Sequence, residues 1–203
     1  MRVVLISQRR IVNQYNDSQE ALDRRWGLFC HQLGVLPIPL LSTVNFQEYF
    51  SELNPCGIFL SGGNDLSTLV NNPENIARDQ FETSLLEYCI RFRIPLVGVC
   101  RGSQFIAQYF GGNVTAVSRH AGVTHLIQVN ISGELIQRTV NSYHNFGITT
   151  LPVTLRVLAT AEDGSIEAFE HESYPILGLM WHPERAAEID WNDVELCNRL
   201  LRK

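Results

Sequence analysis

Short apolar runs alternate with segments of helical periodicity along the first half of the chain. Largely apolar runs predict buried strands at residues 3–6, 35–41, 57–60 and 96–99. Apolar positions at helical spacing predict helices at residues 17–34, 75–93 and 103–110. Pro37 and Pro39 favour a place near the sheet edge for the second strand. Strands that alternate with helices are typical of a mostly parallel, doubly wound sheet.

The second half of the chain is richer in strand patterns. Strands are predicted at residues 125–131, 153–159, 166–169 and 176–180, and a last helix near Asp190. We therefore expect an α/β, flavodoxin-like fold: a doubly wound, mostly parallel sheet flanked by helices, with extra antiparallel strands in the C-terminal half. The sequence shows no repeat or linker, so residues 1–203 are interpreted as a single domain.

Composition narrows the functional classes. The 203 residues carry a formal net charge of −5 and no basic stripe, which argues against a nucleic-acid partner. The five cysteines are irregularly spaced without a C-x-x-C pair, which argues against a disulfide framework or a zinc site. We find no signal-peptide core or membrane-spanning run, so we expect a cytoplasmic protein with free thiols, no membrane contact and no cofactor.

The segment Gly98-Val99-Cys100-Arg101-Gly102-Ser103-Gln104 has the form G-x-C-x-G directly after a predicted strand and before a predicted helix. In this context the central residue of such a motif sits on a strained turn that lifts its side chain out of the sheet. The helix N-terminus that follows stabilises a thiolate. Cys100 is therefore predicted to be a nucleophile, the alternative being a buried cysteine between glycines by chance. The other four cysteines are interpreted as structural.

His182-Pro183-Glu184 follows the predicted strand at 176–180. Proline makes the preceding residue extended, and residues i and i+2 of an extended segment point to the same side. Glu184 can therefore reach the His182 ring, hold one nitrogen and leave the other to accept a proton from a thiol. The alternative is a surface turn with a solvated glutamate.

The motif Ser61-Gly62-Gly63-Asn64-Asp65 also follows a predicted strand. Adjacent glycines allow a backbone N–H to approach a ligand closely, and a tetrahedral oxyanion needs two such donors. The Arg101 amide and a glycine amide from this loop would serve. The alternative is a turn that requires positive φ.

These three segments, in this order, resemble the class I glutamine amidotransferase fold over essentially the whole chain. In that family a cysteine is acylated by a γ-glutamyl group, an amine leaves, and water hydrolyses the thioester. The resemblance implies that Cys100 is the nucleophile, His182 the general base and then acid, and Glu184 the orienting carboxylate, with Gly63 and Arg101 in the oxyanion hole. The substrate-binding residues that it implies are Gly62, Asn64, Gln104, Asn141, Ser142, Tyr143 and His144.

Details within the fold are similar to the γ-glutamyl hydrolase (peptidase C26-type) branch, namely the Gly-Val-Cys-Arg-Gly elbow and the segments at 62–65, 118–125 and 140–144. The N-terminal segment Ser7-Gln8-Arg9 resembles the corresponding segment of enzymes that remove glutamate from γ-glutamyl-CDP-amidate in capsule-sugar phosphoramidate synthesis. The longer hydrolases carry an insertion between the first strand and the first helix that is mostly missing here. The identity of the leaving amine therefore stays open.

His120 and His125 are five residues apart, a spacing that does not place them on one helix face, so no metal pair is expected. They are interpreted as hydrogen-bonded loop histidines, with substrate contact as the alternative, for which His120 is the candidate site residue. Arg119 is a candidate contact for an acidic leaving group.

Three functions are compatible with these motifs. The favoured one is an amide (C–N) hydrolase that splits a small γ-glutamyl amide and releases glutamate. The second is a glutaminase subunit that delivers ammonia to a separate synthase, which would be a partner protein because this chain has no room for that domain. The third is a non-catalytic binding module, which the intact triad residues disfavour. A homodimer stays open.

Overall fold

The structure is a computed structural model, and it describes residues 2–131 and 134–202. The strands of its main sheet are β1 (Arg2–Ile6), β4 (Val35–Pro39), β5 (Gly57–Leu60), β6 (Leu96–Val99), β7 (Asn113–Ala116), β8 (Ala121–Ile131), β9 (Glu134–Tyr143), β10 (Phe146–Thr150), β11 (Leu155–Ala161), β12 (Ile166–His171) and β13 (Ile176–Leu179). The helices are α1 (Trp26–Leu33), α2 (Phe46–Leu53), α3 (Pro73–Phe92), α4 (Arg101–Tyr109), the 3-10 turn η1 (Pro183–Arg185) and α5 (Trp191–Leu201). The expected strand and helix alternation is confirmed.

The main sheet runs in the order β4-β1-β5-β6-β13-β12-β11-β8-β9, with β7 and β10 paired beside this path. Strands β4, β1, β5, β6 and β13 are parallel, whereas β12, β11, β8 and β9 are antiparallel to their neighbours. The expected doubly wound sheet with extra antiparallel strands in the C-terminal half is therefore confirmed. The strand with the two prolines, β4, lies at the edge of the sheet, as predicted.

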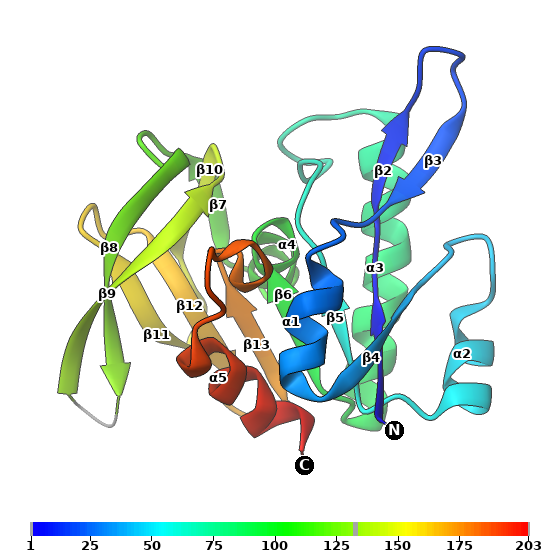
Figure 1. Cartoon of the computed structure of the whole chain (residues 1–203). Helices are drawn as coiled ribbons and strands as arrows, with labels where there is room; N and C mark the ends of the chain where they lie inside the picture. The colour runs from blue at the N-terminus through cyan, green and yellow to red at the C-terminus, as the bar shows by residue number, and fades with distance from the viewer. Residues whose placement is uncertain (1, 132–133, 203) are drawn as a thin grey trace.

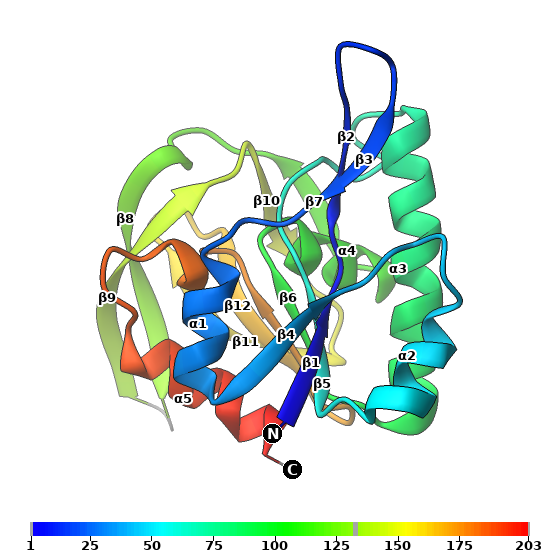
Figure 2. The same ribbon diagram turned by 45° about the vertical axis from the view of Figure 1, so that its right-hand side comes forward.

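Successive residues of the parallel strands pack alternately into two hydrophobic cores, one on each face of the sheet. In β1, Val4 packs in a core with α1 and α5, whereas Leu5 packs on the opposite face with α3 and α4. Figures 1 and 2 show the same arrangement, with α1 and α5 over one face of the sheet and α3 over the other. Both faces of these strands are therefore covered, and this is why their sequences are continuous apolar runs instead of alternating ones.

One predicted helix start is wrong. Ser18–Ala21 forms strand β3, which pairs with β2 (Arg9–Val12) in a two-stranded hairpin that projects beyond the main sheet (Figure 1). The Asn13 side chain accepts hydrogen bonds from the Tyr15 and Asp17 amides and closes this hairpin. Asn, Asp and Ser stabilise turns as readily as helix N-termini, so local composition could not separate the two. The helix begins later, at Trp26.

The parallel strands end together at one edge of the sheet. Ile6 pairs with Phe59, Phe59 with Val97, and Val99 with Leu179, so the residues that follow β1, β5, β6 and β13 converge there. In open α/β sheets this carboxyl edge is where ligands bind. No helix among residues 2–131 and 134–202 is long and apolar enough to cross a membrane.

Candidate active site

Cys100 occupies a sharp turn between β6 and α4. Its φ of 52° and ψ of −107° lie outside the regions that L-residues favour, so the backbone is strained there. Helix α4 begins at Arg101, two residues earlier than predicted, which places the sulfur directly at the helix N-terminus. Most of the Cys100 side chain is buried, but it contributes to the wall of a pocket.

The two glycines of the elbow are required by close backbone contacts. A Cβ at Gly102 would lie 2.1 Å from the Leu60 carbonyl oxygen, and one at Gly98 would lie 2.6 Å from the Gly102 carbonyl carbon. Only glycine permits β5, β6 and α4 to approach this closely. The glycines thus bring the N-terminus of α4 against the sheet.

His182 lies just beyond β13 in an extended conformation, with φ of −108° and ψ of 92°. Its Nδ1 is 2.6 Å from Glu184 Oε1, and both side chains are almost fully buried. The Asn141 side chain fixes the His182 backbone from both sides, because its Oδ1 accepts from the His182 amide at 2.9 Å and its Nδ2 donates to the His182 carbonyl at 2.8 Å. The ring orientation is thus set by one carboxylate and one amide.

The loop after β5 brings the cysteine and the histidine together. A Cβ on Gly62 would lie 2.6 Å from His182 Cε1 and 3.4 Å from Cys100 Cβ. Burial favours neutral imidazole, but the Cys100 sulfur and the Glu184 carboxylate outweigh it and raise the pKa of His182 to about 9. With this pKa the ring is an imidazolium at neutral pH, and its Nδ1 is hydrogen-bonded to the Glu184 carboxylate.

Arg78 orients the glycine loop, residues 61–63, by binding its carbonyl oxygens. This buried guanidinium on α3 donates to the carbonyl of Ser61 at 2.7 Å, to that of Gly62 at 3.3 Å and to that of Gly63. Three carbonyls in a row are turned toward the arginine, and Gly63 takes a φ of 82°. A loop whose carbonyls are held on one side has its N–H groups free for a ligand on another.

A buried charge cluster supports the elbow. Arg101 on α4 pairs with Glu82 and Asp79 of α3, and Glu82 also accepts from Arg78 Nε at 2.9 Å and from Ser7 Oγ at 2.7 Å. Burial opposes ionisation of Glu82, but the two arginines hold the pKa of this carboxyl below its usual value. The cluster joins α3, α4 and the end of β1 beneath the nucleophile.

The pocket at Cys100 has a volume of about 190 Å³. The predicted site residues that line it are Gly63, Asn64, Cys100, Arg101, Gln104, Tyr143, His144 and His182. The structure adds Arg9, Asp65, Asn145, Phe146 and Arg185 to this lining.

Several predicted substrate contacts have other partners or positions. Gln104 lines the pocket, but its Nε2 donates to the Phe146 carbonyl at 2.7 Å. The Ser142 hydroxyl donates to the His120 carbonyl, so it supports the wall from outside. Arg119 is exposed and His120 is buried against Asp163, and neither lines the pocket. Substrate contact by these two side chains stays a prediction that this pocket does not support.

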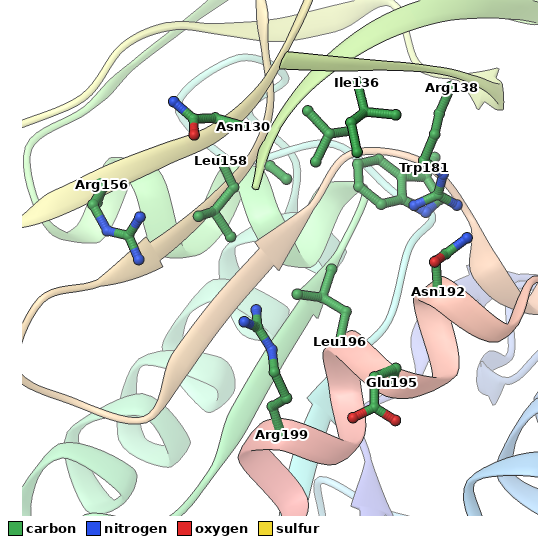
Figure 3. Close-up of a pocket in the computed structure, with 12 residues that line it drawn as sticks. Asn130, Ile136, Arg138, Arg156, Leu158, Trp181, Asn192, Glu195, Leu196 and Arg199 are labelled. Atoms are coloured by element: carbon green, nitrogen blue, oxygen red, sulfur yellow. The ribbon is translucent and has the colours of Figure 1, made fainter. Parts of the chain in front are cut away.

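A larger cavity lies between α5 and the antiparallel strands (Figure 3). It has a volume of about 420 Å³, and none of the predicted catalytic residues lines it. Arg138 in its wall pairs with Asp193 at 3.0 Å and lies over the Trp181 ring at 5.5 Å. The nucleophile, the imidazole and the glycine loop meet at the smaller pocket and not at this cavity, although the cavity has more than twice its volume.

Comparison with known proteins agrees with this geometry. The peptidase C26 family model matches residues 5–184, from β1 to Glu184. The chain belongs to the peptidase C26 family. It is 40% identical over 184 residues to the gamma-glutamyl-CDP-amidate hydrolase of Campylobacter jejuni, covering 89% of this chain and 88% of that protein. The predicted family resemblance is confirmed, and the chain is an amide hydrolase.

Two further similarities are to a glutamine-hydrolyzing subunit and to a solved glutamine amidotransferase. One subunit of the glutamine-hydrolyzing GMP synthase of Thermococcus kodakarensis is 32% identical over 180 residues, covering 83% of this chain and 89% of that protein. A solved glutamine amidotransferase from Thermotoga maritima superposes with a TM-score of 0.70 at 18% identity, covering 99% of this chain and 84% of that one. At that identity the likeness concerns the fold alone.

Several residues of this site were not predicted from the sequence. Arg9 and Arg185 reach the pocket from the β2–β3 hairpin and from η1, and Arg185 lies 3.6 Å from Glu184. Arg78 and Glu82 do have a local signal, since charges four residues apart on one helix face form pairs. That pattern is usually solvent-exposed, however, and only their contacts reveal that they are buried.

Proposed function

We propose that this peptidase C26 protein hydrolyses a γ-glutamyl amide through a Cys100–His182–Glu184 triad and a γ-glutamyl thioester, releasing glutamate. The observation that carries the proposal is the convergence of three separate strand ends. A strained cysteine at a helix N-terminus, an imidazolium bonded to a buried carboxylate, and a glycine loop with oriented carbonyls lie within contact distance. This is the set of groups that thiolate acyl transfer requires.

The reaction follows from the positions of these groups. The Cys100 thiolate attacks the γ-carbonyl carbon of the substrate, and the electron pair of the C=O bond moves to oxygen. The amides of Gly63 and Arg101 donate to that oxyanion. When the intermediate collapses, the C–N bond breaks and the His182 imidazolium gives its proton to the departing amine.

The second half returns the enzyme to its starting state. Neutral His182, still held at Nδ1 by Glu184, takes a proton from water as the water oxygen attacks the thioester. The C–S bond then breaks, glutamate leaves, and the thiolate and the imidazolium are restored. Glu184 orients the ring in both halves and keeps its negative charge.

The pocket dimensions and charge favour a substrate with an anionic leaving group. A cavity of about 190 Å³ is smaller than the roughly 300–1,000 Å³ of pockets that enclose a drug-sized ligand. It suits the glutamyl half of the substrate and leaves the amine half outside. Arg9 lines the pocket from the hairpin and has no ion-pair partner among the salt bridges of the described residues, so its guanidinium can meet a phosphate.

These features and the Campylobacter relative support γ-glutamyl-CDP-amidate as the substrate. A different observation supports a second candidate function, a glutaminase subunit that supplies ammonia to a synthase partner. The GMP synthase subunit of Thermococcus kodakarensis covers almost as much of this chain. The two functions differ in what the isolated protein turns over.

The test measures glutamate released from γ-glutamyl-CDP-amidate, from simpler γ-glutamyl amides and from glutamine, with no other protein present. We expect kcat/KM to be highest for the nucleotide conjugate. If glutamine is the only substrate that is hydrolysed, and its hydrolysis appears only when a synthase is added in a separate assay, the second function would be supported. A panel of nucleotide-free γ-glutamyl amides turned over as well as the conjugate would refute the assignment of the leaving group.

Rapid acid quench and mass spectrometry test the chemistry separately. We expect a glutamyl adduct on the peptide that contains Cys100, and neither adduct nor turnover in Cys100→Ala. That variant removes the nucleophile and little volume, so its fold should be kept. Cys30→Ala, which truncates another buried thiol, is the matched control and should keep both. An active Cys100→Ala enzyme would refute the thioester route.

A further inference from the structure

Three imidazoles surround one buried carboxylate outside the triad. Glu167 on β12 lies 3.4 Å (Oε1) from His120 Nδ1, 3.6 Å (Oε2) from His125 Nε2 and 3.6 Å (Oε1) from His144 Nε2. The donor atoms of His120, His125 and Glu167 all lie within 4.8 Å of one another. Glu167 is fully buried, and His120 and His144 are each 4% exposed.

The outer hydrogen bonds of two rings determine which nitrogen faces inward without a proton. His144 Nδ1 is 3.0 Å from the Phe146 carbonyl, which only accepts, so Nδ1 carries the hydrogen and Nε2 has the lone pair. His120 Nε2 is 3.0 Å from the Asp163 carboxylate, which also only accepts, so its Nδ1 has the lone pair. Both lone pairs point toward Glu167.

The atoms that face the centre of this cluster are unsatisfied. His120 Nδ1, His125 Nε2, His144 Nε2 and both oxygens of Glu167 are buried without a hydrogen-bond partner. In neutral imidazoles these are lone pairs opposed to a carboxylate, which is an unfavourable arrangement in a buried site. A positive charge at the centre removes the conflict, because every atom that faces it is then a ligand.

We propose that the cluster binds one divalent transition-metal ion of the zinc class. The ligands are His120 Nδ1, His125 Nε2 and the Glu167 carboxylate, and His144 Nε2 lies 3.6 Å from the same carboxylate. Bonds of about 2.0–2.1 Å put tetrahedral ligand atoms about 3.3 Å apart, which is close to the 3.4 and 3.6 Å between the Glu167 oxygens and the nitrogens of His120 and His125. Asp163 and the Phe146 carbonyl then hold the outer ring nitrogens, as the second shell of a metal-ligating histidine does.

The five-residue spacing of His120 and His125 disfavours a shared metal only where the segment is helical. His120 and His125 belong to no helix, because β8 begins at Ala121 and its register shifts between Ala121 and Val123, where Gly122 has a φ of 72°. The irregularity brings the two rings to a centroid distance of 4.6 Å. His144 lines the Cys100 pocket, so the metal would brace the wall of that pocket from outside.

The experiment measures metal content in a Cys100→Ala background, where the reactive thiol cannot bind the ion. The purified full chain is equilibrated with Zn²⁺, freed of unbound ion by gel filtration and analysed by mass spectrometry for zinc. We expect one Zn²⁺ per chain, a higher Tm than for chelator-treated protein, and tetrahedral d–d absorption with Co²⁺. None of these readouts requires activity, so the outcome is independent of the proposed function.

Variants assign the ion to the cluster. His125→Ala and Glu167→Gln should lose the stoichiometric zinc, whereas His31→Ala, which removes an exposed imidazole on α1, should keep it. Asp163→Asn changes a half-exposed outer residue that need not disturb folding, and it should weaken Zn²⁺ binding by about 10–100-fold in a chelator competition. Substoichiometric zinc, or zinc that all of these variants retain, would overturn the proposal and leave a cluster that is neutralised by protons.

Discussion

Replacing Glu184 by Gln removes the carboxylate charge that faces His182 and keeps the size and shape of the side chain. The carboxylate oxygen is 2.6 Å from His182 Nδ1, and both groups are almost fully buried. The amide oxygen of glutamine can still accept from Nδ1–H. The substitution therefore isolates the contribution of charge to a hydrogen bond whose geometry is retained.

The magnitude follows from that bond. A hydrogen bond to a charged group contributes about 1.5–3 kcal/mol. One pKa unit corresponds to about 1.4 kcal/mol, so losing this contribution lowers the pKa of His182 by about 1–2 units. The pKa starts at about 9, and the Cys100 sulfur still raises it in the variant. The same free energy, lost from the transition state, reduces kcat/KM by about tenfold to a hundredfold.

The sign of the pH effect is fixed by the direction of the shift. The pKa of His182 is raised in the folded enzyme, so the imidazolium is fully present below the ordinary value of 6.5 and is lost as pH rises through about 9. The proton that the amine needs disappears over the same range. We therefore expect kcat/KM to fall on the alkaline side near pH 9, and near pH 7–8 in Glu184→Gln.

The assay is a pH profile of kcat/KM for glutamate release, with circular dichroism at each pH to show that the protein stays folded. Glu188→Gln is the matched control, because it removes one exposed negative charge four residues away and should leave the alkaline limb in place. An alkaline limb that does not move in Glu184→Gln, or that moves equally in the control, would refute the reasoning.

Three further substitutions test the supports of the site. Gly62→Ala puts a methyl group 2.6 Å from His182 Cε1 and should reduce kcat at least about a hundredfold. Gly27→Ala, which has open space around its Cβ, is the control and should leave kcat unchanged. If Gly62→Ala keeps the kcat of the unsubstituted enzyme, the close contact between this loop and His182 is not needed for catalysis. Asn141→Asp loses the donor to the His182 carbonyl, and kcat should drop up to about tenfold at constant Tm. A change in KM alone would contradict a role for Asn141 in positioning His182. Glu82→Gln removes charge between two buried arginines and should lower the free energy of unfolding by about 3–5 kcal/mol in denaturant titrations, with exposed Glu87→Gln as the unchanged control; a fully stable Glu82→Gln would show that the cluster carries little net stability.

One prediction failed because the same residue types serve two structures. Asp17 lies in the turn of a hairpin, and Ser18 begins its second strand, where a helix start was expected. The local pattern was compatible with either conformation. Pairing between strands decided the outcome.

The sequence by itself determined the elbow, the strand ends and the His182–Glu184 contact. These depend on backbone geometry within a few residues: glycines where chains cross, a proline that extends its neighbour, and parallel strands that end at one edge. Only the tertiary structure decided that Arg78 and Glu82 are buried beneath Cys100. A charged residue is expected to be solvent-exposed until its partners are known, because burial of charge is tolerated only where segments distant in sequence neutralise one another.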